Sequence, residues 1–260
     1  MSYVKLIHDE EEVKRFFDLV LPPLTGTECY FVSLSARNKY LSEEEREVFS
    51  LGRTEMFNKT VVRKKEWNRF IRALRKMECD ERGYTTRSNL PIPSKTLVCY
   101  ININPSDTIK TMFAFQKLLQ EYAVEIASIA FKNGKIENLE NRINKIDNNL
   151  MTCYQKSTGT KHWMDFDFDI VKDERVIEST NEILDMKGIT RFFWIDTKSG
   201  YHLLVDTNQV QCNPDDLSSE IEHALWDEHD IDAEEIIYNK NAMIPIPGTF
   251  QGDYPVRLIL

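Results

Sequence analysis

Three aspartates alternate with apolar residues between His162 and Ile170. Asp165, Asp167 and Asp169 share one parity, and the other parity is held by Met164, Phe166, Phe168 and Ile170. In a β-strand the carboxylates then share one face about 7 Å apart, where they repel one another unless a cation lies between them. The spacing predicts divalent metal ions on a sheet face, although a solvated acidic strand face fits the same pattern.

A second polar cluster, Lys198-Ser199-Gly200-Tyr201-His202, lies in a predicted tight turn between two strands. Glycine in a tight turn lets the backbone approach a ligand closely. The lysine, the hydroxyl group and the backbone N–H groups all suit phosphate oxygens. A histidine on a strand is more often a packed residue than a ligand, unless its strand lies next to the acidic one. The cluster therefore predicts a phosphate contact that depends on how the two strands pair.

Acidic residues alternate with other residues again between His229 and Asn239, ahead of Ile246-Pro247-Gly248-Thr249. One of these acids would complete a three-carboxylate metal site. Asp232 and Glu234 both remain open as that third ligand, and a charged helix end followed by a loop is the alternative interpretation.

The elements that must position these residues are read from periodicity. In the first half we expect a helix over 9–20, strands over 30–34 and 96–103, and a long helix over 107–131, followed by a helical arm over 135–150. A basic block at 53–76 has nine Lys and Arg against two Glu, with a helical apolar stripe at Trp67, Phe70, Ile71 and Leu74. The block is interpreted either as a solvated helix face or as a path for a phosphate backbone.

The second half has a different pattern. The acidic strand (162–170) is followed by a helix at 173–187, strands at 191–197 and 201–206, a helix starting at Asn213-Pro214, and an extended region from 234 to 260. This β-α-β-β-α-β order is the ferredoxin-like split βαβ unit, an antiparallel sheet with both helices on one face and the other face free. We predict an α/β (α+β) protein with an N-terminal α/β module at 1–155 and a second module at 156–260.

Composition limits the class of protein. The 260 residues are 42% hydrophobic with a formal net charge of −9, which argues against non-specific binding of nucleic acid by the whole surface but does not exclude a local basic groove. Five scattered cysteines without a CxxC pair indicate reduced thiols and no structural zinc. No leader or membrane segment is visible, so we expect a cytoplasmic protein without membrane contact.

Taken in order, the three clusters resemble the catalytic module of the archaeo-eukaryotic primase superfamily, which includes primases and primase-polymerases. Asp165-Phe166-Asp167 is similar to the family's acid-x-acid pair, and Gly200-Tyr201-His202 to its small-x-His motif. An acid between 230 and 235 matches the third acid. Ile246-Pro247-Gly248-Thr249 is similar to the segment that follows it. The strand Tyr100-Ile101-Asn102-Ile103-Asn104-Pro105 resembles the strand ending in Asn-Pro of phage and plasmid relatives. The resemblance covers the C-terminal hundred residues well and the first half loosely.

The resemblance implies a two-part catalytic fold, in which an RRM-like C-terminal module and the N-terminal module form a cleft. It implies metal binding and catalysis by Asp165, Asp167 and either Asp232 or Glu234. Nucleotide binding falls to His202 with Lys198, Ser199 and Gly200. Relatives commonly carry basic residues before the Pro-Gly, where this chain has Ala242 and Pro245, so Arg257 is expected to compensate.

The implied activity is that of a nucleotidyltransferase: template-dependent synthesis of short RNA or DNA strands in replication, by a DNA primase or primase-polymerase of a phage or plasmid. Two Mg²⁺ or Mn²⁺ ions are the implied cofactors. The implied partners are single-stranded DNA, NTPs or dNTPs, and a replicative helicase or accessory primase subunit, in the host cytoplasm. The alternatives are a non-enzymatic RRM-like single-strand-binding accessory protein, or a metal-dependent nucleotidyl cyclase or nuclease.

Overall fold

The structure is a computed structural model that describes residues 4–78, 83–86, 88–131, 145–229, 236–239 and 243–259. Within these residues the chain forms seven α-helices and two antiparallel β-sheets, so the predicted mixed α/β (α+β) class is confirmed. None of the described helices is both long enough and apolar enough to cross a membrane.

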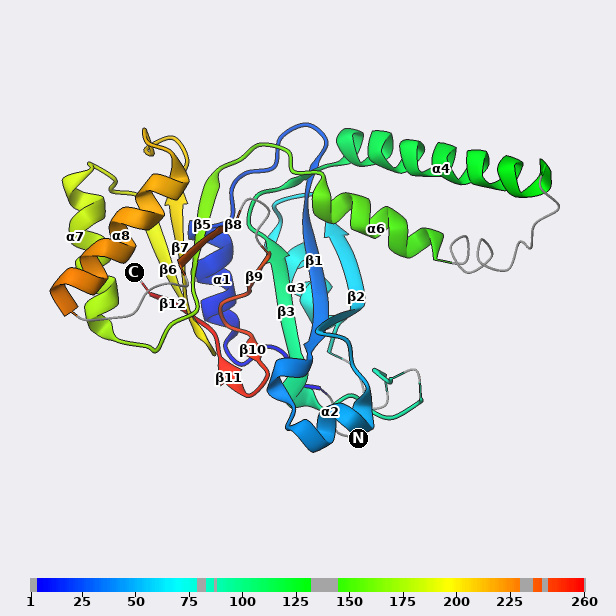
Figure 1. Cartoon of the computed structure of the whole chain (residues 1–260), viewed down its shortest axis with the longest axis horizontal. Helices are drawn as coiled ribbons and strands as arrows, with labels where there is room; N and C mark the ends of the chain where they lie inside the picture. The colour runs from blue at the N-terminus through cyan, green and yellow to red at the C-terminus, as the bar shows by residue number, and fades with distance from the viewer. Residues whose placement is uncertain are drawn as a thin grey trace.

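The first sheet is built mainly from the N-terminal half of the chain (Figure 1). Its strands run in the order β11-β10-β3-β1-β2, with β4 paired to β1 and β9 paired to β3. They span β1 (Glu28–Arg37), β2 (Thr54–Val62), β3 (Leu97–Asn102), β4 (Ser106–Asp107), β9 (Met243–Pro245), β10 (Phe250–Gln251) and β11 (Tyr254–Pro255). Among the described strands β2 pairs only with β1, so β2 is an edge strand.

Helices α1 (Glu10–Leu19) and α3 (Trp67–Arg75) pack on one side of the first sheet. Asp9 caps α1, because its side chain accepts hydrogen bonds from the Glu11 and Glu12 backbone N–H groups. The apolar stripe predicted in the basic block forms the inner face of α3. Three short elements, η1 (Asn38–Tyr40), α2 (Glu43–Phe49) and η2 (Ser94–Thr96), lie at one end of the sheet.

The second sheet has the strand order β12-β6-β7-β5-β8. It comprises β5 (Trp163–Phe168), β6 (Phe192–Thr197), β7 (Gly200–Asp206), β8 (Ile236–Asn239) and β12 (Arg257–Ile259), and every pairing is antiparallel. Helices α7 (Glu174–Met186) and α8 (Pro214–His229) cover one face. Their apolar residues share a core with Phe166 and Phe168 of β5. The predicted alternation of the acidic strand therefore directs its phenylalanines toward the helices.

The two sheets share a core on the side of the second sheet that faces away from α7 and α8, in addition to the core under those helices. Trp163, Ile195, Leu204 and Leu258 of the second sheet belong to the same buried cluster as α1 and the first sheet. The chain also crosses between the sheets near its C-terminal end, since β9, β10 and β11 join the first sheet and β12 returns to the second (Figure 1). The body of the protein is thus a composite of both sheets.

Asn104, which follows β3, fixes the start of the acidic strand. Its side-chain oxygen accepts hydrogen bonds from the backbone N–H groups of His162 and Trp163, at 2.7 and 2.8 Å, and its amide nitrogen donates to the Trp163 carbonyl at 2.8 Å. Asn104 is buried, so these bonds form away from competing water. The Asn-Pro motif noted in the sequence therefore joins the end of β3 to β5.

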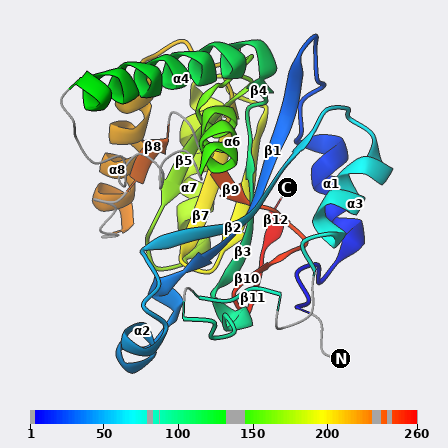
Figure 2. The same cartoon turned by 90° about the vertical axis from the view of Figure 1, so that its right-hand side faces the viewer.

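A pair of helices projects from the body as an arm, α4 (Thr108–Phe131) with α6 (Ile146–Lys156) (Figures 1 and 2). Asn149 of α6 donates a hydrogen bond of 2.8 Å to the Tyr122 hydroxyl of α4. The predicted helix over 107–131 is confirmed. Of the arm predicted at 135–150, the structure describes only the residues from 145 onward.

Candidate functional site

Asp165 and Asp167 lie on the face of β5 that points away from α7 and α8. Trp163, which shares their parity, is buried in the core of the first sheet and donates a hydrogen bond to the Val20 carbonyl at 2.9 Å. Asp165 is only 1% exposed, whereas the Asp167 side chain is 40% exposed. The sequence predicted that this face of the sheet is free, and that prediction is wrong for the Asp165 end of β5. The first sheet and α1 cover one end of it, and the Asp167 end reaches solvent.

His202 lies between these two carboxylates. It sits on β7, directly opposite Asp167 in the β5–β7 register. Its Nδ1 is 2.9 Å from Asp165 Oδ1, and its Nε2 is 3.7 Å from Asp167 Oδ1. The pairing of the two strands, on which the predicted phosphate contact of His202 depends, is thus present. We call Asp165, Asp167 and His202 the acidic centre.

The electrostatics of the acidic centre favour a charged histidine. Burial acts to lower the pKa of His202, but the charge of Asp165 and the hydrogen bond to it outweigh burial and raise the pKa to about 9. Burial also raises the pKa of Asp167, as do the neighbouring charges of Asp165 and Asp169, while His202 acts in the opposite direction. Two crowded carboxylates thus share one imidazolium.

One buried carboxylate oxygen of the acidic centre has no hydrogen-bond partner in the part of the chain that the structure describes. Asp165 Oδ2 is buried and accepts no hydrogen bond from the described residues. An unpartnered oxygen on a buried carboxylate is costly, because desolvation is not repaid by any donor. Its position points to a ligand that supplies positive charge or a hydrogen-bond donor.

The Lys198-Ser199-Gly200 turn joins β6 to the start of β7, but its lysine side chain binds a residue outside the acidic centre. Gly200 has φ +150°, and a Cβ there would lie 1.8 Å from the Phe168 carbonyl oxygen, so only glycine fits. The Lys198 side chain forms an ion pair with Asp253, and its backbone N–H donates to Gln251. Of the described side chains in the predicted cluster 198–202, His202 is the one found in contact with Asp165 and Asp167.

The first half of the chain adds residues that were not among the predicted site residues. Lys39 of η1 donates a hydrogen bond of 3.0 Å to Ser199, and the charges of Asp169 and Asp167 partly offset the lowering of its pKa by burial. Tyr100 of β3 is also close to Asp167, whose charge adds to the effect of burial in raising the tyrosine pKa. Arg37 Nη1 donates to the Tyr100 hydroxyl at 2.8 Å. The sequence signal for these residues was the polar run Arg37-Asn38-Lys39-Tyr40 directly after a predicted strand, where basic residues often bind ligands.

Other predicted residues lie apart from the acidic centre or outside the described residues. Arg257 pairs in register with Asp196, whereas its neighbour Leu258 pairs with Ile195, which in turn faces His202. Because alternate residues point to opposite faces, Arg257 lies on the face away from the acidic centre. The third-acid candidates Asp232 and Glu234 lie outside the described residues, just ahead of β8, which pairs with β5.

The described residues contain no group of three or more His, Cys, Asp or Glu side chains arranged to hold a metal ion. The two aspartates supply oxygen ligands of the kind that Mg²⁺ and Mn²⁺ prefer. The predicted third carboxylate, Asp232 or Glu234, lies outside the described residues.

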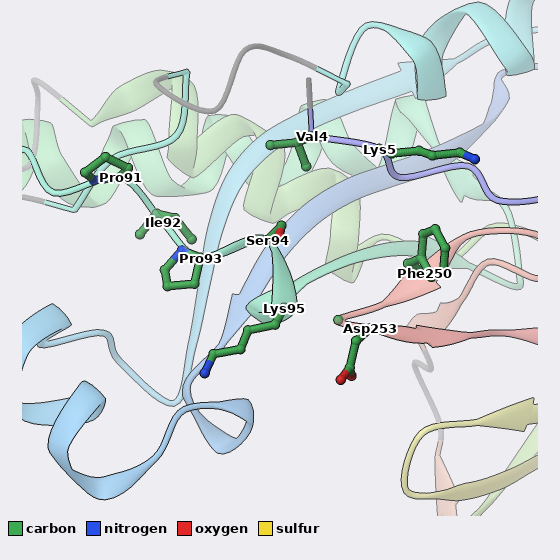
Figure 3. A pocket seen from close by; sticks show the side chains of 10 residues that line it. Val4, Lys5, Pro91, Ile92, Pro93, Ser94, Lys95, Phe250 and Asp253 are labelled. Carbon is green, nitrogen blue, oxygen red and sulfur yellow. The ribbon is translucent and has the colours of Figure 1, made fainter. Parts of the chain in front are cut away.

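Figure 3 shows the lining of a large cavity, to which no residue of the acidic centre contributes. It has a volume of about 760 Å³, and Lys5, Lys95, Phe250 and Asp253 are among its lining residues. Lys95 is bound to Glu45, at 2.5 and 2.7 Å, and Asp253 is bound to Lys198. Two of the charges that line the cavity are thus already paired, and the ion pair of Asp253 connects it to the predicted phosphate turn.

Comparison with known proteins found no matching family model, no similar curated protein and no similar solved structure.

Proposed function

We propose that this protein is a nucleotidyltransferase that copies a single-stranded template into short RNA or DNA strands, as a primase or primase-polymerase does. The observation that carries the proposal is the acidic centre. Two carboxylates on one strand face share a buried histidine from the neighbouring strand, and the buried Asp165 Oδ2 has no partner among the described residues. A purely structural ion pair would have no need of a second, crowded carboxylate.

The arrangement of the second sheet supports the proposal. The order β8-β5-β7-β6, with α7 and α8 on one face, is the order expected of a ferredoxin-like, RRM-like module. In such a module the two middle strands are β5 and β7, and these carry the acidic centre. Lys39 of η1 and Tyr100 of β3 lie near Asp167 from the first half of the chain, which supports a site that both modules form.

The residues fit a divalent metal. Asp165 Oδ2 is a buried, unpartnered hard oxygen, and Asp167 presents a half-exposed carboxylate beside it. Asp165 and Asp167 would hold the ions, with Asp232 or Glu234 as the third ligand. Two Mg²⁺ or Mn²⁺ ions, when bound, activate the attacking 3′-hydroxyl and stabilise the charge on the leaving pyrophosphate.

The protein's own groups divide the remaining work. His202, held charged by Asp165, donates toward nucleotide phosphate and limits repulsion between that phosphate and the carboxylates. Lys39, which donates a hydrogen bond to the Ser199 hydroxyl, supplies a second positive charge for phosphate at the solvent-exposed end of the same face. Arg37 fixes the Tyr100 hydroxyl at the rim of the site. The substrates would be NTPs or dNTPs, with single-stranded DNA as template and a helicase or accessory subunit as partner.

The test is synthesis on a template. Purified protein, single-stranded DNA, labelled nucleotides and Mn²⁺ should yield labelled polymer, and Asp165→Ala plus Asp167→Ala should reduce the product to background. The matched control is Glu182→Ala plus Asp185→Ala, which removes two exposed acids from α7. Full activity in the first double variant would refute the assignment. Product formed from nucleotide without template would instead favour a cyclase.

A further inference from the structure

The basic block of the sequence folds into a groove along the edge of the first sheet. One part of the groove, of about 270 Å³, lies between β2 and α3 and is lined by Arg63, Arg69, Arg72 and Lys76 among others. An adjoining part, of about 350 Å³, is lined by Arg72, Arg75 and Lys76 together with Asn68 and Ile71. No acidic residue lines either part. We call the surface formed by these five cations the basic groove.

Of the five cations, Arg72 and Lys76 have neither an ion pair nor a side-chain hydrogen bond to the described residues, whereas Arg63 donates to the Tyr154 hydroxyl at 3.2 Å. Arg69 is paired with Glu66, and Arg75 with Glu10. Arg72 and Lys76 are exposed and form no ion pair with the described residues. They are four residues apart on the helix, where like charges oppose helix formation, in a chain that has 42 acidic and 33 basic residues available to mix. A solvated helix face would normally intersperse both signs.

The groove suits a flexible anionic chain. On α3 the cations at 69, 72 and 76 follow one face, with rises of about 4.5 and 6 Å between them, a spacing comparable to that of successive phosphates in an extended strand. The facing element is the edge strand β2, whose outer N–H groups have no partner strand among the described residues. Such groups donate readily to phosphate oxygens. A compact anion would engage only part of this row.

The same edge leads toward the acidic centre. Lys59 of β2 pairs in register with Ser33 of β1, and Ser33 pairs with Tyr100 of β3. One row across three strands therefore runs from Lys59 at the edge to Tyr100 beside Asp167, and it spans about 10 Å between the outer backbones. The side chains of this row lie on the face of the sheet opposite α3, because the alternate residues Tyr30, Val32 and Leu34 pack with α3. A strand held in the groove therefore has to pass around the edge strand β2 to reach Asp167.

We propose that the basic groove binds the sugar-phosphate backbone of single-stranded nucleic acid without regard to sequence and feeds that strand toward Asp167. The inference rests on the proposed function for the role of the strand as template. Binding to the groove is measured apart from synthesis. Arg72 and Lys76 are the residues whose loss should weaken binding most.

The experiment measures binding of a fluorescent single-stranded oligonucleotide by anisotropy, in EDTA and without nucleotide, over a range of salt concentrations. Arg72→Gln plus Lys76→Gln should bind roughly tenfold more weakly at low salt. Its slope of log K against log salt should be shallower by about 1.4, because each lost phosphate contact removes about 0.7. The matched control is Arg175→Gln plus Lys187→Gln, whose cations are already paired with Asp173 and Glu220.

Each outcome decides the proposal. Unchanged affinity and slope in the groove variant, or no binding by the native protein, overturns it, and so does equal displacement of the oligonucleotide by polyglutamate. If the variant fails to fold, a second measurement on the native protein takes the place of the variant: bound oligonucleotide should protect Lys76 from acetylation. Absence of protection overturns the proposal. If the native protein binds the oligonucleotide through the groove but makes no polymer, the groove proposal is supported and the proposed function is refuted.

Discussion

The acidic centre and the basic groove both bring like charges close together, but the first does so in a buried site and the second on the solvent-exposed surface. In the acidic centre the carboxylates are drawn toward the core and share one histidine, and Asp165 is 1% exposed. In the basic groove Arg72 and Lys76 stay in water on the outside of α3. Water screens the second set and not the first. Substitutions in the acidic centre should therefore alter chemistry and stability, and those in the groove only binding.

The largest expected effect is on catalysis at the exposed end of the acidic centre. Asp167→Asn keeps the shape of the side chain and removes its charge. Synthesis should fall by roughly 10³-fold, equivalent to about 4 kcal/mol of transition-state stabilisation. Initial rates of labelled polymer formation measure this, with Glu182→Ala plus Asp185→Ala as control. A loss of less than tenfold would place the chemistry elsewhere.

The next effect is on stability at the buried end. His202→Ala leaves Asp165 buried without its partner, which should cost about 3–5 kcal/mol. Urea unfolding followed by circular dichroism gives the free energy of unfolding. Asp165→Asn in the same background should recover part of the loss, since the unpaired charge is then gone. A cost below about 1 kcal/mol for His202→Ala would mean that water already reaches Asp165.

Glu28 is an intermediate case, a buried carboxylate held by neutral donors. It accepts hydrogen bonds from Thr25 and from the Thr160 backbone N–H, and it joins β1 to the segment that enters β5. Burial acts to raise the pKa of Glu28, but the hydrogen bonds from Thr160 and Thr25 outweigh burial and lower it. Glu28→Gln should cost about 1–3 kcal/mol at pH 7.

The pH dependence of this cost has a definite sign. Because the folded-state pKa of Glu28 is depressed, its stabilisation is complete above the ordinary carboxyl value of 4.5 and is lost as the pH falls through the lower, folded-state value. Unfolding free energies of native protein and Glu28→Gln should therefore converge in acid. A gap that stays constant below pH 4.5 would contradict the role of the carboxylate charge.

The smallest effect is the stability change in the basic groove. Arg72→Gln plus Lys76→Gln should change the free energy of unfolding by less than about 0.5 kcal/mol, because both side chains are solvated and their mutual repulsion is removed. Thermal melts of the binding variant measure this directly. A large destabilisation would show that the two cations support α3 rather than a ligand.

The sequence predicted local features better than long-range ones. The alternation in β5 and the glycine turn before His202 are local patterns, and both are found in the structure. Strand alternation cannot say what covers a face, so the burial of Asp165 was not foreseen. Likewise, no local signal pairs Lys198 with Asp253, or brings Lys39 beside Ser199, because these contacts depend on how distant segments pack.

The crossing of β9, β10 and β11 into the first sheet has a consequence for how the protein folds during synthesis. Tyr100 of β3 pairs with Pro245, and Val98 pairs with Gln251, so the first sheet stays incomplete until the ribosome has made the region beyond 243. Pairings so distant along the chain close slowly. Until then one side of β3 remains an unpaired edge open to other chains. Nascent chains halted before residue 243 should therefore be the form that most needs a chaperone.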